Sequence, residues 1–131
     1  MTLVVDASVV VAALIDTGST GDWAETQLAT ATDLAAPAIL GAEVANVLRR
    51  SETAQLIDTS HANLAFADLK RLPVLSVGFE LLADRMWQLR HNLTSYDASY
   101  VATAELLGAP LATLDTRVTT APGTSCDFIT P

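Results

Sequence analysis

LVVDASVVVAALI, residues 3–15, joins a run of aliphatic residues to a second apolar run through a single aspartate, Asp6. Residues 3–5 have the continuous apolar, β-branched pattern of a strand covered on both faces, which is typical of parallel sheets. The segment from Ala7 to about Ile15 then predicts a helix. A buried strand that leads directly into a helix favours an α/β fold.

The same alternation of short apolar strands and helices continues to the end of the sequence. Further strands are predicted at residues 34–36, 74–77 and 111–114, with a final strand near Cys126. A second helix is predicted after a turn at Gly18–Gly21, and a third from Pro37 to about Arg50. A fourth is capped by Asp58 or Ser60 and stopped by Pro73. A fifth spans 79–91, and a sixth is capped by Ser95 and closed by Gly108. We therefore expect a three-layer α/β/α fold with a short, mainly parallel central sheet.

Size and composition indicate one soluble domain spanning residues 1–131. Half of the 131 residues are hydrophobic, which is enough for one sizeable core. The lone Cys126 excludes an intramolecular disulfide and a cysteine-based zinc site, and the first apolar stretch is interrupted by Asp6 and lacks a positively charged leader. We expect a cytoplasmic protein that does not enter a membrane.

The net charge of −8 argues against bulk electrostatic attraction to nucleic acid. Seven basic residues face fifteen acidic ones. The objection weakens if several carboxylates converge and bind cations, because a bound ion reverses the local charge that a phosphate meets.

Four acidic residues stand at positions that need an explanation. Asp6 and Asp115 each follow a predicted strand, and ligands of open parallel sheets bind beyond the carboxyl ends of strands. For either aspartate alone, a turn-forming role is as good an interpretation. Glu43 and Asp97 instead lie on the apolar faces of their predicted helices, although Asp97 also suits a helix first turn.

Burial of an unpaired carboxylate costs several kcal/mol, so Glu43 and Asp97 should be paired, protonated or bound to metal. Arg49, Arg50 and Arg90 are available for pairing. Oxygen ligands without a His or Cys cluster suit Mg²⁺ or Mn²⁺ better than zinc. Periodicity leaves the metal site and the ion pairs equally open.

Three segments, LVVDASVVVAAL, PAILGAEVANVLRR and LTSYDASYVATAELLGAPLATLDTRV, resemble in this order the PIN domains, most closely the VapC-type toxins of VapBC toxin–antitoxin systems. The resemblance implies a Mg²⁺- or Mn²⁺-dependent endoribonuclease in which Asp6, Glu43, Asp97 and Asp115 form the metal centre. It also places Ser8 and Thr113 where family members often carry a small hydroxyl residue. Hydrogen bonds of turns and caps explain these two equally well.

The resemblance further implies an RNA substrate, a VapB-type antitoxin whose C-terminal segment occupies a groove near the active site, and homodimers. Arg49, Arg50 and Arg117 are candidate RNA contacts, although ordinary surface charge explains each of them as well. Some relatives carry a further polar or acidic residue just after the last aspartate, whereas Thr116, Arg117 and Val118 follow here, so the number of ions stays open. The alternatives are a non-catalytic PIN-like binding module and, with weaker support, a magnesium-dependent phosphatase or a receiver domain.

Overall fold

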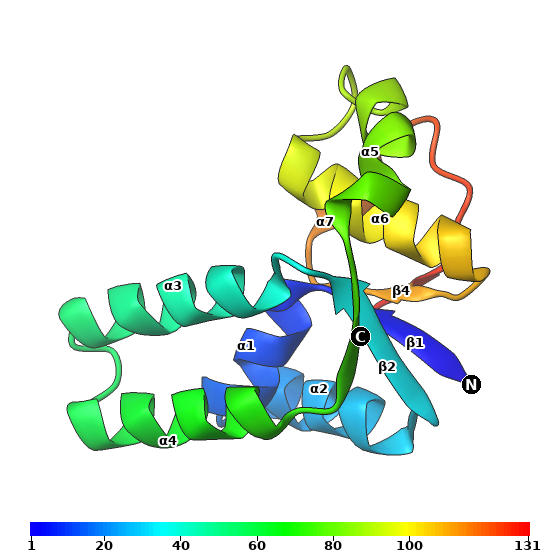
Figure 1. The fold of residues 1–131 in the computed structure, drawn as a ribbon. Coiled ribbons are helices and arrows are strands. Elements are labelled where there is room, and N and C mark those ends of the chain that lie inside the picture. The colour runs from blue at the N-terminus through cyan, green and yellow to red at the C-terminus, as the bar shows by residue number, and fades with distance from the viewer.

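The computed structural model describes residues 1–131 and contains one sheet of five parallel strands (Figure 1). Across the sheet the strands are β3 (Val74–Val77), β2 (Asp33–Pro37), β1 (Thr2–Val5), β4 (Leu111–Ala112) and β5 (Phe128–Ile129). The helices are α1 (Ala7–Ile15), α2 (Ser19–Thr30), α3 (Leu40–Thr53), α4 (Thr59–Arg71), α5 (Phe79–Gln88), α6 (Ser95–Leu107) and α7 (Thr116–Thr119). The predicted α/β class with a parallel sheet is confirmed.

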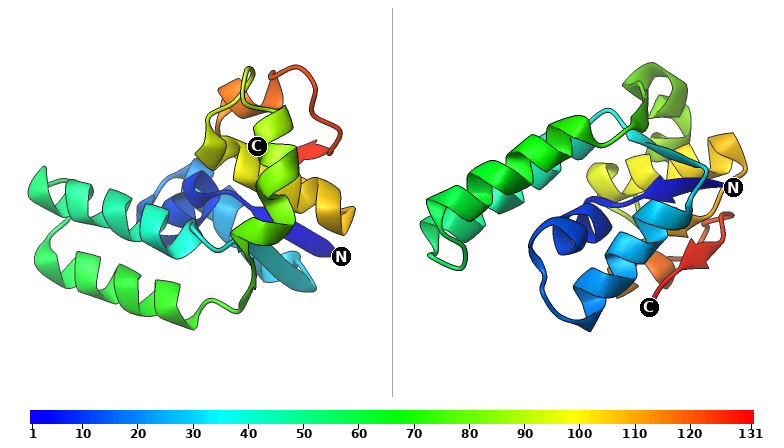
Figure 2. Two further views of the ribbon diagram at one scale, coloured as in Figure 1. Left: turned by 45° about the horizontal axis from the view of Figure 1, so that its top comes forward. Right: turned by 90° about the horizontal axis from the view of Figure 1, so that it is seen from below.

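The helices form two groups on opposite sides of the sheet (Figure 1). On one side α1 packs against α2, α3 and α4, while on the other α5 packs on α6 and α6 covers β1, β2 and β4. Helices α3 and α4 run side by side and project beyond the sheet in every view (Figure 2). No helix combines the length and the apolar character needed to cross a membrane.

The order of the strands places a switch point between β1 and β4. The chain adds β2 and then β3 on one side of β1, and then returns to add β4 and β5 on the other side. In open parallel sheets a crevice forms at such a point, beyond the carboxyl ends of the strands. Asp6 directly follows β1 and Asp115 lies three residues after the end of β4, so both lie at this crevice.

The apolar runs that predicted the strands form the core. Val4 and Val5 of β1 and Val9 and Val10 of α1 are fully buried, as is Leu111 of β4. Because β1 lies between β2 and β4 and is covered by helices on both faces, all its inner positions are apolar rather than alternating. This core holds the ends of β1 and β4 in fixed positions.

Two of the predicted helix starts are wrong. Pro37 is the last residue of β2 and α3 begins at Leu40; the missing N–H of Pro37 falls where the strand ends. Ser95 is already the first residue of α6, because the hydroxyl of Thr94 accepts the hydrogen bond from the Asp97 N–H, at 3.1 Å. For α4 the cap is Asp58 and not Ser60.

Other boundaries also differ. Helix α2 starts at Ser19, so Gly21 lies inside it and not in a turn; a Cβ at Gly21 would lie 1.9 Å from the Asp16 carbonyl oxygen, so only glycine permits this close approach. Strand β4 ends at Ala112, because the Leu114 N–H donates to a side chain and not to the sheet. Helix α5 ends at Gln88, and the short α7 was not predicted.

Candidate metal centre

A cleft of about 800 Å³ opens beyond the carboxyl ends of β1 and β4. Its lining includes all four of the acidic residues singled out in the sequence: Asp6 at the start of α1, Glu43 in the first turn of α3, Asp97 in the first turn of α6 and Asp115 before α7. The fold thus brings together carboxylates from four separate segments of the chain.

Asp6 is the most buried of the four, with 8% of its surface exposed. Its Oδ2 atom accepts hydrogen bonds from the hydroxyls of Ser8, at 2.7 Å, and Thr113, at 2.8 Å. The same two hydroxyls accept the backbone N–H groups of Leu114 and Asp115, at 3.1 and 3.0 Å. Ser8 and Thr113 therefore fix the Asp6 carboxylate and tie the end of β4 to it.

Glu43 is held by a buried tyrosine. The Tyr100 hydroxyl donates to Glu43 Oε1 at 2.7 Å, and Tyr100 is 2% exposed. Burial raises the pKa of Glu43, and the charges of Asp6 and Asp97 raise it further, against the opposing effect of the Tyr100 hydrogen bond. The sequence does not reveal this contact, because no spacing rule links a tyrosine to an acid on another helix.

Asp97 has no cationic partner either. Burial raises its pKa, with further contributions from the charges of Asp6 and Asp115, and these outweigh the hydrogen bond with Thr94 and the more distant charge of Arg117. The ion pairs of the structure are Arg71–Asp68, Arg85–Glu105 and Arg117–Asp115. Pairing of Glu43 or Asp97 with Arg49, Arg50 or Arg90 is therefore excluded.

Asp115 differs from the other three acids because an arginine neutralises it. The side chain of Arg117 approaches its Oδ2 atom to 2.7 Å. Hydrogen bonds from the side chain and the backbone N–H of Arg117 hold the pKa of Asp115 below its usual range, although partial burial acts in the opposite direction. This contact, like the Tyr100–Glu43 contact, was not predicted from the sequence.

The sequence and the fold match known proteins along nearly the whole chain. A family model for the PIN domain matches residues 3–123. This chain belongs to the PIN domain family. Ribonuclease VapC1 of Mycobacterium tuberculosis is 40% identical over 129 residues, covering 95% of this chain and 94% of the relative. VapC ribonuclease Mb0985 of Mycobacterium bovis is 37% identical over 116 residues, covering 88% of this chain and 87% of the relative.

The same fold occurs in a crystal structure of VapBC2 from Rickettsia felis, bound to a DNA fragment from its promoter. The TM-score is 0.68 at 14% identity, and the match covers 99% of this chain and 98% of the other. The family model and the two VapC relatives confirm the predicted resemblance to PIN domains of the VapC type.

The chemistry of this PIN domain cleft fits a hard divalent cation. Its acidic ligands are all oxygen donors, and its lining contains no His or Cys. Asp6 and Glu43 accept hydrogen bonds only from neutral groups, and Asp97 forms no ion pair, so the negative charge of these three carboxylates is not compensated. In the structure, however, no three Asp, Glu, His or Cys side chains are already arranged as ligands of one ion.

Of the three arginines predicted to contact RNA, only Arg117 lines the cleft of the PIN domain. Arg49 and Arg50 are exposed on α3, where the Arg49 side chain donates to Asn46 Oδ1 at 3.0 and 3.1 Å. Any contact of these two residues with a substrate therefore lies outside the acidic cleft.

Proposed function

We propose that this PIN domain is a metal-dependent endoribonuclease and the toxin of a VapBC-type toxin–antitoxin pair. Relatives at 37 and 40% identity are VapC ribonucleases. The observation that carries the proposal is the placement of Glu43 and Asp97 beside Asp6, half-buried and without a cationic partner. A fold that only required stability would pair or replace these acids.

In this proposal Asp6, Glu43, Asp97 and Asp115 hold Mg²⁺ or Mn²⁺. The bound ion supplies a lowered pKa for water and a positive charge next to a phosphate oxygen. The protein supplies position: Ser8 and Thr113 orient Asp6, and Tyr100 orients Glu43. Carboxylates fixed by such outer hydrogen bonds need little reorganisation when the substrate binds.

Hydrolysis requires that a water oxygen form a bond to phosphorus while one ester P–O bond breaks and the leaving oxygen gains a proton. One of the four carboxylates is proposed to orient the water or to accept the proton that it loses. No side-chain nucleophile is needed.

Substrate binding is proposed to be local, because the net charge of −8 disfavours long-range attraction of RNA. Arg117 is the basic residue that lines the cleft. Its exposed guanidinium can donate hydrogen bonds to a phosphate. We also propose the cytoplasm as the location of this activity.

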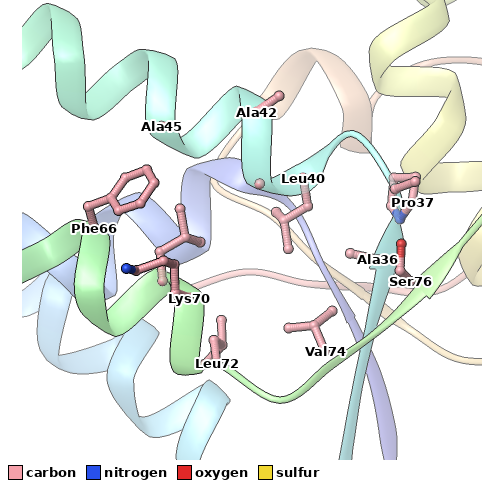
Figure 3. Close-up of a pocket in the computed structure, with 13 residues that line it drawn as sticks. Ala36, Pro37, Leu40, Ala42, Ala45, Phe66, Lys70, Leu72, Val74 and Ser76 are labelled. Atoms are coloured by element: carbon pink, nitrogen blue, oxygen red, sulfur yellow. The ribbon is translucent and has the colours of Figure 1, made fainter.

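An antitoxin is proposed as the protein partner, since the Rickettsia felis VapBC2 structure pairs proteins of this kind. An apolar groove of about 450 Å³ lies between α3, α4 and β3 (Figure 3). Phe66 and Lys70 line it from α4, Leu40 from α3, and Leu72 and Val74 from the chain that leads into β3. Such a groove suits the apolar face of a partner helix. The homodimer implied by the family resemblance stays a prediction.

The nuclease proposal is tested with a structured RNA incubated with the purified chain in Mg²⁺ or in EDTA. We expect cleavage by the wild type only with the metal, and none by Asp6→Ala or Asp97→Ala at temperatures where circular dichroism shows both to be folded. Unchanged cleavage by both variants would contradict the site. A binding module would bind its partner without turnover, and a phosphatase would hydrolyse p-nitrophenyl phosphate and leave RNA intact.

The antitoxin proposal is tested by co-purification with the product of a neighbouring short reading frame. Phe66→Asp should reduce co-purification, because it places a charge in the groove. Leu64→Asp is the matched control: it lies on the same helix, is 67% exposed and does not line the groove. Undiminished co-purification of Phe66→Asp would assign the partner to another surface, and equal loss in both variants would show that the effect is not specific to the groove.

A further inference from the structure

Arg117 engages both oxygens of the Asp115 carboxylate. Its backbone N–H and its Nε donate to Oδ1, at 2.9 and 3.1 Å, and its Nη2 donates to Oδ2, at 2.7 Å. This fork is the geometry in which arginine binds a carboxylate most strongly. A second ion bound at Asp115 would have to displace this guanidinium.

The other three proposed ligands, Asp6, Glu43 and Asp97, have no such cation. Asp6 accepts from two hydroxyls and Glu43 from a phenol, while the Asp97 carboxylate forms no ion pair and the Asp97 backbone N–H donates to the Thr94 hydroxyl. Neutral donors orient a carboxylate but leave its charge. Of the four proposed ligands, three therefore lack a compensating cation and one, Asp115, already has one. Asp16, a fifth acid of the lining, accepts the Gly18 backbone N–H and forms no ion pair.

The surrounding charge adds to the attraction within the pair. Arg117 is 83% exposed, and an exposed ion pair in isolation contributes little. Here the carboxylate of Asp97 adds to the attraction that Asp115 exerts on the guanidinium. A divalent ion at Asp115 would remove the partner of Arg117 and place two cations side by side, which is unfavourable.

We infer that Arg117 takes the place of a second cation, so that the centre binds one divalent ion per chain, at Asp6, Glu43 and Asp97. This inference rests on the proposed metal-dependent function and narrows its ligands from four carboxylates to three, because Asp115 stays paired with Arg117. The guanidinium keeps further N–H groups that point to no carboxylate and can donate to a nonbridging phosphate oxygen. There it stabilises charge as the bond from water to phosphorus forms and the ester bond breaks; Arg117 transfers no proton.

The number of bound ions tests the inference without a cleavage assay. Purified full-length chain is titrated with Mn²⁺, and bound ions are counted by electron paramagnetic resonance and calorimetry. We expect one ion per chain for the wild type and for Arg117→Lys, and two for Arg117→Asp, which removes the cation and adds a ligand beside Asp115. Arg71→Asp makes the same change of charge at an exposed site outside the cleft and should still bind one ion.

Each outcome separates the inference from the proposed function. Two ions in the wild type, or one ion in Arg117→Asp, would overturn the role of Arg117 and leave the metal centre intact. No bound ion in the folded wild type would overturn both. Arg117→Gln should cleave RNA at least about tenfold more slowly at saturating Mn²⁺, because a phosphate contact is lost. Unchanged cleavage would contradict the proposed contact between Arg117 and the phosphate.

Discussion

Helix α6 carries a partly buried acid near each end, and the two acids have opposite electrostatic surroundings. At the C-terminal end, Glu105 accepts from Arg85 Nε at 2.6 Å and Nη2 at 3.1 Å, and from the Ser125 backbone N–H at 2.7 Å. At the N-terminal end, Asp97 faces Asp6 and Asp115 and has no cationic partner. The charge of Glu105 is neutralised, and its contact with Ser125 holds the last segment of the chain against α6. The charge of Asp97 is not neutralised.

This difference identifies Asp97 as an acid that lowers the stability of the fold, because it is partly buried and has no cationic partner. Full pairing of Asp97 was feasible, since an arginine pairs with an acid two turns further along the same helix. Sites that break a local rule of stability are commonly functional sites. The contrast therefore supports the cleft as the site of cation binding. Substitutions at the N-terminal end of α6 should reduce RNA cleavage, whereas substitutions at its C-terminal end should reduce stability.

The largest effect is expected from removing one charge at each end. Asp97→Asn should lower RNA cleavage by about 100-fold or more, because a metal ligand accounts for several kcal/mol of transition-state stabilisation. Glu105→Gln removes the same charge outside the cleft and should leave the cleavage rate of folded protein unchanged. Cleavage rates in Mg²⁺ for both variants decide this, and an equal loss in the two would contradict the contrast.

Loss of the neutralised pair should reduce stability. Arg85→Ala leaves Glu105 without its charged partner and also removes the hydrogen bond to the Gly123 carbonyl, at 2.7 Å. We expect a loss of about 1 to 3 kcal/mol in the free energy of unfolding, measured in urea. Arg71→Ala, which breaks an exposed pair with Asp68, should cost less than about 0.5 kcal/mol and serves as the control.

Neutralising an acid in the cleft should increase stability when no metal is present. Because the pKa of Glu43 is raised in the folded state, the charged side chain destabilises the protein above that pKa. Glu43→Gln should therefore unfold a few degrees higher than the wild type at pH 7 in EDTA. The difference should shrink as the pH falls through the raised pKa of folded Glu43 towards the ordinary value of 4.5, because the folded and unfolded states then bind this proton more equally. A melting temperature below that of the wild type at pH 7 would contradict the account.

The smallest effect is expected at Tyr100. Tyr100→Phe removes one hydrogen bond to Glu43 and keeps the buried ring, so the affinity for Mn²⁺ should fall about threefold. A titration followed by calorimetry measures this change. If the affinity is unchanged while the melting temperature falls, Tyr100 has a structural role only.

The sequence predicted the strands and most helices because their apolar periods are long and regular, and it singled out Glu43 and Asp97 because charge interrupts two of those periods. Boundaries that depend on a single hydrogen bond were less accessible. Thr94 and Ser95 are both good caps in the sequence, and only the folded backbone shows which hydroxyl accepts from Asp97.

Contacts between distant segments were also beyond the sequence. Tyr100 and Glu43 are 57 residues apart, and Thr113 and Asp6 are 107 apart. The fork between Arg117 and Asp115 is local, yet the sequence does not distinguish it from an arginine that extends into solvent. These contacts follow from tertiary packing, which places α3, α6 and the end of β4 around Asp6.

The central claim is that the uncompensated acids bind a divalent cation, and thermal unfolding tests it most directly. In the wild type the melting temperature should rise steadily with Mg²⁺ above its value in EDTA, because a ligand at 100 times its Kd adds about 2.7 kcal/mol of stability. Asp97→Asn should show little or no rise. A wild type that does not respond to Mg²⁺, or a variant with the same rise, would contradict the claim.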